Sequence, residues 1–452
     1  MATQLKKTNR QFVCQHCGSV YGKWQGRCDD CQEWNSLTQT AFPKKNSSKE
    51  CSEAQPLDDI DTQESPRITS GISELDRLLG GGFVPSSVSL LGGEPGIGKS
   101  TLTMHIAQAV AAKGGKVLYI SGEESAQQIV LRAERLGKKD PNILLLIETD
   151  IEHVCAKIHR HNPDLVVIDS IQVMQHSQLN AVPGTVSQVR YCADHFISCI
   201  KKRQSIGLMI GHITRDGHLA GPKVLEHMVD CIFFLEGEHR RGYRILRSYK
   251  NRYSATDEIG LFEMGQKGLT TLSNSSQYFI DPDTLKHPGT VVAPVEHGSR
   301  SLLVEVQALA VDASYGAPKR NFVGVDTHRA NLMIATLEKN CGIRLGNKDI
   351  FINVVGGLKI SEPALDLAMC MALLSSLKNH VIPEHVAAVG EVGLSGEIRA
   401  IPQLKQRLIE LQRLGITHCL IPERNKKTLP SMIQIKPVFL SHLSHIIQQF
   451  KT

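Results

Sequence analysis

The sequence predicts an α/β protein whose central domain is built on a mainly parallel β-sheet. Apolar runs alternate with helix-like stretches through the middle of the chain, at residues 88–91, 117–120, 142–147, 165–168, 208–211 and 231–235. Such alternation is typical of parallel strands joined by crossover helices. Four closely spaced cysteines before this region and a change to a Ser/Asn/Asp/Pro-rich composition after it indicate a small ribbon and a further domain.

Length and composition limit the class of protein. The chain has 452 residues, 41% of them apolar and 21% charged, and at roughly 150 residues per domain this predicts two or three domains. No apolar run reaches the ~18 residues of a membrane span, and the first residues lack the apolar core of a signal peptide. We therefore expect a cytoplasmic protein without a membrane partner. The net charge of +6 and the pI of about 8.6 fit a polyanionic partner without establishing one.

The N-terminal cysteines form two knuckles, Cys14-x2-Cys17 and Cys28-x2-Cys31, separated by ten residues. Each knuckle can offer two thiolates to one tetrahedral ion, so four sulfurs complete a structural Zn²⁺ site. A redox pair and an iron–sulfur cluster are the alternatives. A segment this short and poor in apolar residues would depend on the metal to fold, and we expect a C4 zinc ribbon over residues 1–40.

Both tryptophans of the chain, Trp24 and Trp34, flank the second knuckle. They either cover the metal core or stack on nucleic-acid bases. The remaining cysteines are scattered, mostly in apolar stretches, as in a protein of a reducing compartment. Residues 41–66 are rich in Pro, Lys, Ser, Glu and Asp without apolar periodicity, which predicts a flexible linker.

Residues 93–100 read Gly-Glu-Pro-Gly-Ile-Gly-Lys-Ser, a complete G-x-x-x-x-G-K-[ST] phosphate loop between an apolar run and the helix-like stretch 101–112. Backbone N–H groups of such a loop and the N-terminus of the following helix bind phosphates, with a nucleoside triphosphate and Mg²⁺ as the expected ligands. Lys99 would reach the β- and γ-phosphates and Ser100 would bind Mg²⁺. The expected nucleotide-binding residues of the loop are Gly93, Glu94, Pro95, Gly96, Ile97, Gly98, Lys99, Ser100 and Thr101.

Polar residues follow other predicted strands at the edge of the sheet where the phosphate loop lies. Asp169 ends the run 165–168 and is expected to bind Mg²⁺ directly or through water, with a helix N-cap as the alternative. Glu123 and Glu124 follow residues 117–120, and one of them, taken as Glu123, would polarise the attacking water; an ordinary acidic first turn of a helix is the alternative. His212 would sense the γ-phosphate or be a structural histidine.

The order of these motifs resembles the RadA family of bacterial DNA-repair proteins, also called Sms, over essentially the whole chain. The segments that carry the resemblance are the ribbon and residues 93–101, 120–125, 166–172, 211–230 and 250–254. The family's Lys-Asn-Arg-Phe-Gly hallmark stands here as Lys250-Asn251-Arg252-Tyr253-Ser254. The resemblance implies a RecA-like P-loop ATPase core over residues 67–273. It also implies a homo-oligomeric ring, a hexamer, that acts as a helicase or branch-migration motor on single-stranded and branched DNA with recombination proteins such as RecA.

The hallmark lies in a stretch, residues 243–252, that alternates like a strand. Alternation would place Lys250 and Arg252 on the same side, together with Arg244. In a ring, Lys250 and Arg252 could act on the ATP of the neighbouring subunit. A DNA-binding stretch that includes Arg244 and Arg247 is one alternative, and a solvated hairpin is another. By the resemblance, two loops would line a central channel and supply Arg190, Arg215 and Lys223 as phosphate contacts.

The last domain, residues 274–452, resembles the proteolytic domain of Lon proteases in residues 351–368 and 390–405. Those enzymes use a Ser–Lys dyad. Lys405 falls on the dyad lysine, but Ala364 occupies the nucleophile position and Ser361 is three residues out of register. We therefore expect a noncatalytic assembly domain and, for the chain, an ATP-driven DNA motor. The alternatives are a protein-directed ATPase and an ATP-dependent Lon-type protease.

Overall fold

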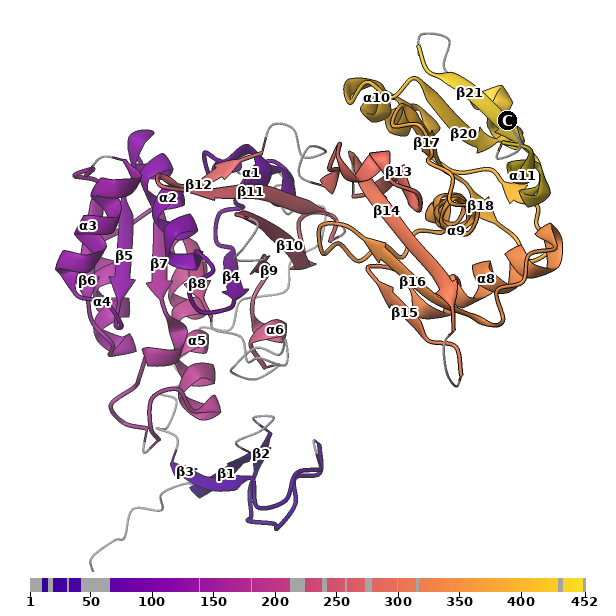
Figure 1. Ribbon diagram of the computed structural model, residues 1–452. Coiled ribbons are helices and arrows are strands. Elements are labelled where there is room, and N and C mark those ends of the chain that lie inside the picture. The colour runs from indigo at the N-terminus through magenta and orange to yellow at the C-terminus, as the bar shows by residue number, and fades with distance from the viewer. Residues whose placement is uncertain are drawn as a thin grey trace, which may run out of the picture. The chain divides into compact units, whose positions relative to one another are not determined.

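The computed structural model describes residues 10–14, 19–30, 32–41, 66–137, 139–179, 181–211, 224–237, 242–256, 258–272, 279–298, 300–313, 317–429 and 434–449. The chain divides into two compact units, Met1–Leu272 and Ser273–Thr452. Both are mixed α/β structures (Figure 1). Among the described residues, no helix is both long enough and apolar enough to cross a membrane.

The N-terminal ribbon is an antiparallel sheet of three short strands, β1 (Arg10–Cys14), β2 (Val20–Tyr21) and β3 (Leu37–Ala41), in the order β2-β1-β3. Its buried hydrophobic residues in the described segments are few: Val13, Cys14, Cys28 and Leu37. Such a small core supports the expectation that bound metal stabilises the ribbon.

The rest of the first unit surrounds a nine-stranded sheet in the order β12-β11-β10-β9-β4-β8-β7-β5-β6. The six predicted strands are confirmed as the parallel part of this sheet: β4 (Val88–Gly93), β5 (Val117–Ser121), β6 (Ile143–Ile147), β7 (Leu165–Asp169), β8 (Ile206–Ile210) and β9 (Cys231–Glu236). Strands β10 (Tyr243–Asn251), β11 (Ile259–Gly265) and β12 (Gly268–Thr271) continue the sheet in antiparallel fashion.

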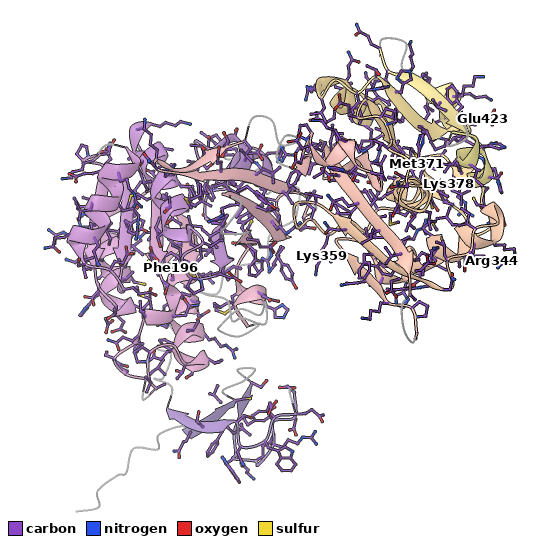
Figure 2. All side chains as sticks on the ribbon, viewed as in Figure 1. Phe196, Arg344, Lys359, Met371, Lys378 and Glu423 are labelled. Atoms are coloured by element: carbon purple, nitrogen blue, oxygen red, sulfur yellow. The ribbon has the colours of Figure 1, made fainter. Side chains whose placement is uncertain are left out.

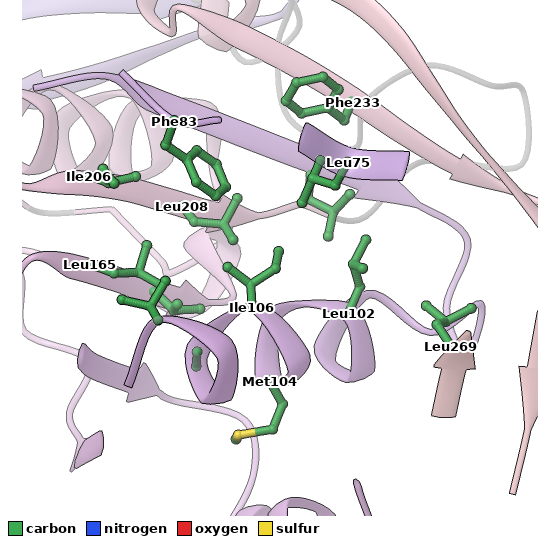
Figure 3. Packing of buried hydrophobic residues seen from close by; sticks show 14 of the residues in the cluster. Leu75, Phe83, Leu102, Met104, Ile106, Leu165, Ile206, Leu208, Phe233 and Leu269 are labelled. Carbon is green, nitrogen blue, oxygen red and sulfur yellow. The ribbon is translucent and has the colours of Figure 1, made fainter. Parts of the chain in front are cut away.

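Helices cover both faces of this sheet and create two apolar cores. One core holds residues of α1 (Ser73–Leu78), α2 (Lys99–Ala112) and α3 (Ala126–Leu136). In it, Leu102 and Ile106 of α2 lie opposite Leu75, Phe83 and Leu208 (Figure 3). The other core holds residues of α4 (Ile151–His161), α5 (Val186–Lys201) and α6 (Val224–Met228), together with the short 3₁₀ helix η2 (Ile171–Val173). Phe196 of α5 belongs to this second core and is fully buried; it is labelled in Figure 2.

Strand β10 corrects one expectation. The predicted simple alternation over residues 243–252 is wrong, because a register shift between Ser248 and Lys250 interrupts the pairing with β9. A bulge of this kind adds a residue to one strand and redirects the side chains that follow it. Ser248 pairs with Phe233, whereas Lys250 pairs with Ile232, the adjacent residue on the opposite face of β9. Lys250 and Arg252 therefore do not continue the face that carries Arg244.

The second unit contains a seven-stranded mixed sheet in the order β15-β16-β14-β13-β17-β20-β21. Its strands are β13 (Thr290–His297), β14 (Arg300–Asp312), β15 (Arg320–Val323), β16 (Lys348–Val354), β17 (Val386–Ala388), β20 (His418–Pro422) and β21 (Lys436–Leu440). A separate pair is formed by β18 (Glu391–Val392) and β19 (Ile398–Arg399).

Helices α8 (Thr327–Cys341), α9 (Asp366–Lys378), α10 (Leu404–Arg413) and α11 (Ile446–Gln449) accompany this second sheet. Helices α9 and α10 both pack on β13 and β14. Short 3₁₀ turns connect the elements: η3 (Thr284–Lys286), η4 (Pro363–Leu365), η5 (Glu423–Thr428) and η6 (Leu443–His445). The strand, turn and apolar helix predicted from residue 351 onward are thus β16, η4 and α9.

Candidate nucleotide site and the surfaces around it

The phosphate loop joins the fully buried strand β4 to helix α2, as its motif requires. Gly93 has a φ of 154°, and a Cβ built there would lie 2.6 Å from the carbonyl oxygen of Leu235 on the neighbouring strand. Gly96 has a φ of 76° and open space around it. A side chain is therefore excluded at Gly93 by contact and disfavoured at Gly96 by conformation.

The tip of the loop is accessible, whereas its base is anchored. Glu94, Pro95 and Gly96 are exposed, and Gly98 and Ser100 are partly exposed. Ile97 and Thr101 are buried, which fixes the loop against the body of the unit. Gly98 is the N-cap of α2, so the loop leads directly into the helix N-terminus, the end that attracts anions.

Lys99 lies in the first turn of α2 with its side chain buried. Its Nζ donates hydrogen bonds to the carbonyl oxygens of Gly93, at 2.8 Å, and Glu94, at 2.9 Å. Burial lowers the pKa of Lys99, while the carboxylates of Asp169, Glu123 and Glu94 act in the opposite direction. The ammonium group and three acids therefore share one site.

Asp169 ends strand β7, which lies next to β5. One of its carboxylate oxygens accepts a hydrogen bond from the buried hydroxyl of Tyr119, at 2.8 Å. Burial raises the pKa of Asp169, and hydrogen bonds with the hydroxyls of Ser100 and Tyr119 oppose that rise. A carboxylate and a serine hydroxyl in contact are hard oxygen donors of the kind that Mg²⁺ prefers, so these residues fit the expected ion.

The two acids after β5 have different environments. The hydroxyl of Ser170 donates a hydrogen bond to the carboxylate of Glu123. Glu123 is an exposed residue beside the site. Glu124 forms an ion pair with Arg132 of α3, and its second carboxylate oxygen is buried without a hydrogen-bond partner among the described residues. The structure thus separates an accessible acid, Glu123, from one that is held in a salt bridge.

Sequence reasoning missed three residues of this site: Tyr119, Ser170 and Arg132. Ser170 directly follows Asp169, so its place next to the predicted Mg²⁺ ligand could have indicated that it belongs to the site. Tyr119 and Arg132 gave no motif, because their roles depend on the neighbouring strand and on the path of helix α3. His212 lies outside the described residues.

Lys250 and Arg252 both bind α6 or the residues that directly follow it within the same chain. The Nζ of Lys250 donates hydrogen bonds to the carbonyl oxygens of Glu226, at 2.6 Å, and Val229, at 2.8 Å. Arg252 forms an ion pair with the buried Asp230 at 3.2 Å. Burial lowers the pKa of Lys250, and the neighbouring positive charge of Arg252 lowers it further. The two cations are therefore close to each other, although they do not lie on the face of β10 that carries Arg244.

The residues predicted to contact DNA differ in their exposure and in their contacts. Arg244 as a surface DNA contact is wrong: it is 5% exposed, and its Nε donates a hydrogen bond to the carbonyl oxygen of Ile97. Arg247 is partly exposed and forms an ion pair with Glu236 at 2.8 Å. Arg190 is exposed on α5. Arg215 and Lys223 lie outside the described residues.

In the ribbon, Cys14 and Cys28 are fully buried, one from each knuckle. Their sulfurs lie 3.2 Å from the hydroxyl oxygens of Ser36 and Tyr21, respectively. Cys17 and Cys31 lie outside the described residues, and the described residues alone contain no group of three or more metal-ligating side chains. Two buried thiols at knuckle positions fit the donor set of a structural metal.

The Lon-like part of the second unit has an apolar core where a peptidase would carry its nucleophile. Ala364 is 3% exposed and belongs to a buried cluster that includes Ile401 and Leu404. Lys405 is exposed in the first turn of α10, and Ser361 is exposed before η4. These positions do not form a Ser–Lys dyad.

Comparison with known families agrees with this layout. Residues 12–39 match the model of a rubredoxin metal binding domain, and residues 52–218 match that of an AAA domain. Residues 329–449 match the model of the Lon protease (S16) C-terminal proteolytic domain.

Similar proteins of full length are known from several bacteria. The chain is 44% identical over 432 residues to the DNA repair protein RadA of Brucella abortus, covering 92% of each chain. It is 41% identical to the DNA repair protein RadA of Escherichia coli strain K12, over 95% of this chain and 96% of that protein. The protein of the same name from Aquifex aeolicus is 42% identical, over 98% and 99%.

Proposed function

Because this chain belongs to the RadA family of DNA repair proteins, we propose that it is a DNA-dependent ATPase that uses ATP to move along and remodel DNA. Its proposed substrates are the single-stranded and branched DNA of recombination intermediates, on which it acts as a helicase or branch-migration motor. With such a substrate, we propose that it acts in the bacterial cytoplasm together with recombination proteins such as RecA.

The convergence of Lys99, Asp169 and Glu123 is the observation that carries this proposal. Lys99 would exchange its two loop carbonyls for the β- and γ-phosphates of ATP, because those phosphates offer a stronger, charged partner. Ser100 and Asp169 would hold Mg²⁺. Glu123, which is exposed and oriented by Ser170, would polarise the attacking water.

The motor function needs coupling between subunits, and the hallmark residues are the proposed route. Lys250 and Arg252 would act on the ATP of the adjacent subunit in a ring, which we propose to be a hexamer. In the isolated chain both side chains bind the segment at residues 226–230. Nucleotide in the neighbouring subunit would compete for them, and this competition would link ATP binding to the position of that segment.

DNA contacts are proposed for exposed basic residues of the ATPase domain. Arg190 is exposed on α5, and Arg247 could exchange its ion pair with Glu236 for a DNA phosphate. Arg215 and Lys223 are further candidates outside the described residues. The ribbon would bind Zn²⁺ through Cys14, Cys17, Cys28 and Cys31, and the Lon-like domain would serve assembly without peptidase activity.

The test compares ATP hydrolysis by the wild type and Lys99→Ala, with and without single-stranded DNA, at low and moderate salt. We expect hydrolysis that DNA stimulates, that depends on Lys99 and whose stimulation fades as salt rises, because phosphate contacts are salt-sensitive. Near-normal turnover by Lys99→Ala would contradict the site. Robust hydrolysis that ignores DNA would point instead to a protein-directed ATPase.

A further inference from the structure

The two tryptophans of the ribbon are exposed side by side. Trp24 is 58% exposed and Trp34 is 68% exposed, so they do not cover the metal core. Both rings approach Gly26: a Cβ built at that glycine would lie 3.7 Å from Cζ3 of Trp34 and 4.0 Å from Cη2 of Trp24. Residues ten apart in sequence thus form one aromatic surface, which we call the tryptophan pair.

The fold of the second knuckle holds Trp34 of this pair in place. The amide of Asn35 donates to the carbonyl of Gly26 at 2.7 Å, and the amide of Cys28 donates to that of Glu33 at 2.9 Å. Arg27 and Trp34 face each other across this short antiparallel bridge. The guanidinium carbon of Arg27 lies 5.6 Å from the centroid of the Trp34 ring, and its nitrogens donate hydrogen bonds to Gln32. The bridge and the cation–π contact restrict Trp34 before any ligand binds.

The surroundings of the pair are polar, which favours nucleic-acid bases over a protein partner. Within the described part of the ribbon, Trp24 and Trp34 are the large hydrophobic side chains that are exposed. Their sequence neighbours are polar or small and at least partly exposed: Lys23, Gln25, Gly26, Arg27, Glu33 and Asn35. A protein-binding hot spot would lie within a contiguous apolar patch. A small exposed indole surface flanked by Lys23 and Arg27 matches stacked bases with nearby phosphates.

From these observations we infer that the tryptophan pair is a stacking site for unpaired bases of single-stranded DNA, with Arg27 and Lys23 beside it for the phosphates. Stacking tolerates any sequence because every base has a π-face. This inference rests on the proposed DNA-directed function and assigns the ribbon a direct role in it. It also assigns the site to DNA with exposed bases, because paired bases cannot reach the indole faces.

The chain offers its own reporter for the test. It contains two tryptophans, both in this pair, so intrinsic tryptophan fluorescence of the full-length protein reports on the ribbon alone. We would titrate the zinc-loaded protein with a thymidine oligonucleotide and follow tryptophan emission. In parallel, the anisotropy of the same oligonucleotide carrying a terminal dye would report binding anywhere on the protein. A double Trp24→Phe, Trp34→Phe protein provides the optical blank.

We expect quenching that follows the same binding curve as the anisotropy. An abasic oligonucleotide of equal length should bind through its phosphates without quenching. Binding without quenching by the thymidine oligonucleotide would overturn the stacking site and leave the proposed function intact. Absence of binding in the anisotropy experiment would overturn both.

Substitutions at the two tryptophans test whether the oligonucleotide binds there. Trp24→Ala and Trp34→Ala should each weaken binding of the thymidine oligonucleotide about fivefold or more, while the Phe variants should retain most of the affinity. The slope of affinity against salt should stay unchanged, because stacking releases no counterions. Zinc content equal to that of the wild type would show that the ribbon is folded. An affinity unchanged in both zinc-loaded Ala variants would contradict the inference.

Discussion

Arg244 donates a hydrogen bond from its Nε to the carbonyl oxygen of Ile97, at 3.1 Å, and thereby ties strand β10 to the phosphate loop. The same side chain donates from a terminal nitrogen to the carbonyl oxygen of Tyr243 at 2.8 Å. Because Arg244 is buried, these carbonyls have little access to water as a substitute partner. An arginine that looked like a DNA contact in the sequence supports the nucleotide site instead.

Arg244→Ala should therefore destabilise the ATPase unit and weaken ATP binding. Leaving buried carbonyl oxygens without a donor costs about 1–3 kcal/mol, which would appear in the free energy of unfolding and in the KM for ATP. Arg247→Ala is the matched control, since its partly exposed ion pair with Glu236 contributes about 0–1 kcal/mol. The salt dependence of DNA binding should be unchanged in Arg244→Ala. A smaller slope of log affinity against log salt concentration would instead indicate that Arg244 contacts a DNA phosphate.

Tyr119→Phe should shift the pH dependence of ATP hydrolysis. The Tyr119 hydroxyl stabilises the ionised form of Asp169, so its loss should raise the pKa of that carboxyl further above its usual value. If hydrolysis needs ionised Asp169, activity falls as pH drops through this pKa, and the variant should lose activity at a higher pH than the wild type. Increasing the pH should restore its rate.

The control for Tyr119→Phe is Thr103→Val. The Thr103 hydroxyl lies 3.4 Å from that of Tyr119, so this variant leaves the Tyr119–Asp169 bond in place. Rate profiles measured across the acidic range should coincide for Thr103→Val and the wild type. An acidic limb that does not move in Tyr119→Phe would mean that Asp169 does not need its charge, which would remove it from the proposed Mg²⁺ site.

Lys250→Ala should bind ATP but hydrolyse it slowly, if its amine acts on the nucleotide of the neighbouring subunit. Mixing it with Lys99→Ala subunits should then restore part of the activity, because a mixed ring pairs an intact phosphate loop with an intact lysine. The structure also offers a competing role within one chain, since Lys250 holds the carbonyl oxygens of Glu226 and Val229. Hydrolysis that stays low in every mixture would favour that role.

The parallel strands and the phosphate loop could be predicted because they depend on local sequence. Apolar runs such as residues 165–168 bury both faces of a strand, and the loop motif fixes its own conformation. Side-chain direction along β10 could not be predicted, because one extra residue near Lys250 shifts the register. The burial of Arg244 depends on the carbonyl of Ile97, 147 residues away in sequence, which no local pattern reveals.

The exposure of the tryptophans could not be predicted from the sequence either. From the sequence, Trp24 and Trp34 could have covered the metal or faced solvent, since both knuckle positions are compatible with either. The structure decides between them, because both rings are more than half exposed, and Trp34 contacts Arg27 across their bridge. The spacing of the cysteines predicts a metal site in the ribbon, but it does not predict the surface formed by the tryptophans.

The second unit should show no peptidase activity, and substitution should not create any. Wild-type protein with ATP should leave casein intact, and so should Ala364→Ser. The new hydroxyl would lie in an apolar core beside Leu404, while Lys405 is exposed to solvent and cannot act as a desolvated base. Burying the hydroxyl should cost about 1–3 kcal/mol, measurable in the free energy of unfolding. Casein turnover by the wild type that disappears in Lys405→Ala would reverse this conclusion, because it would require a nucleophile other than residue 364 within reach of that amine.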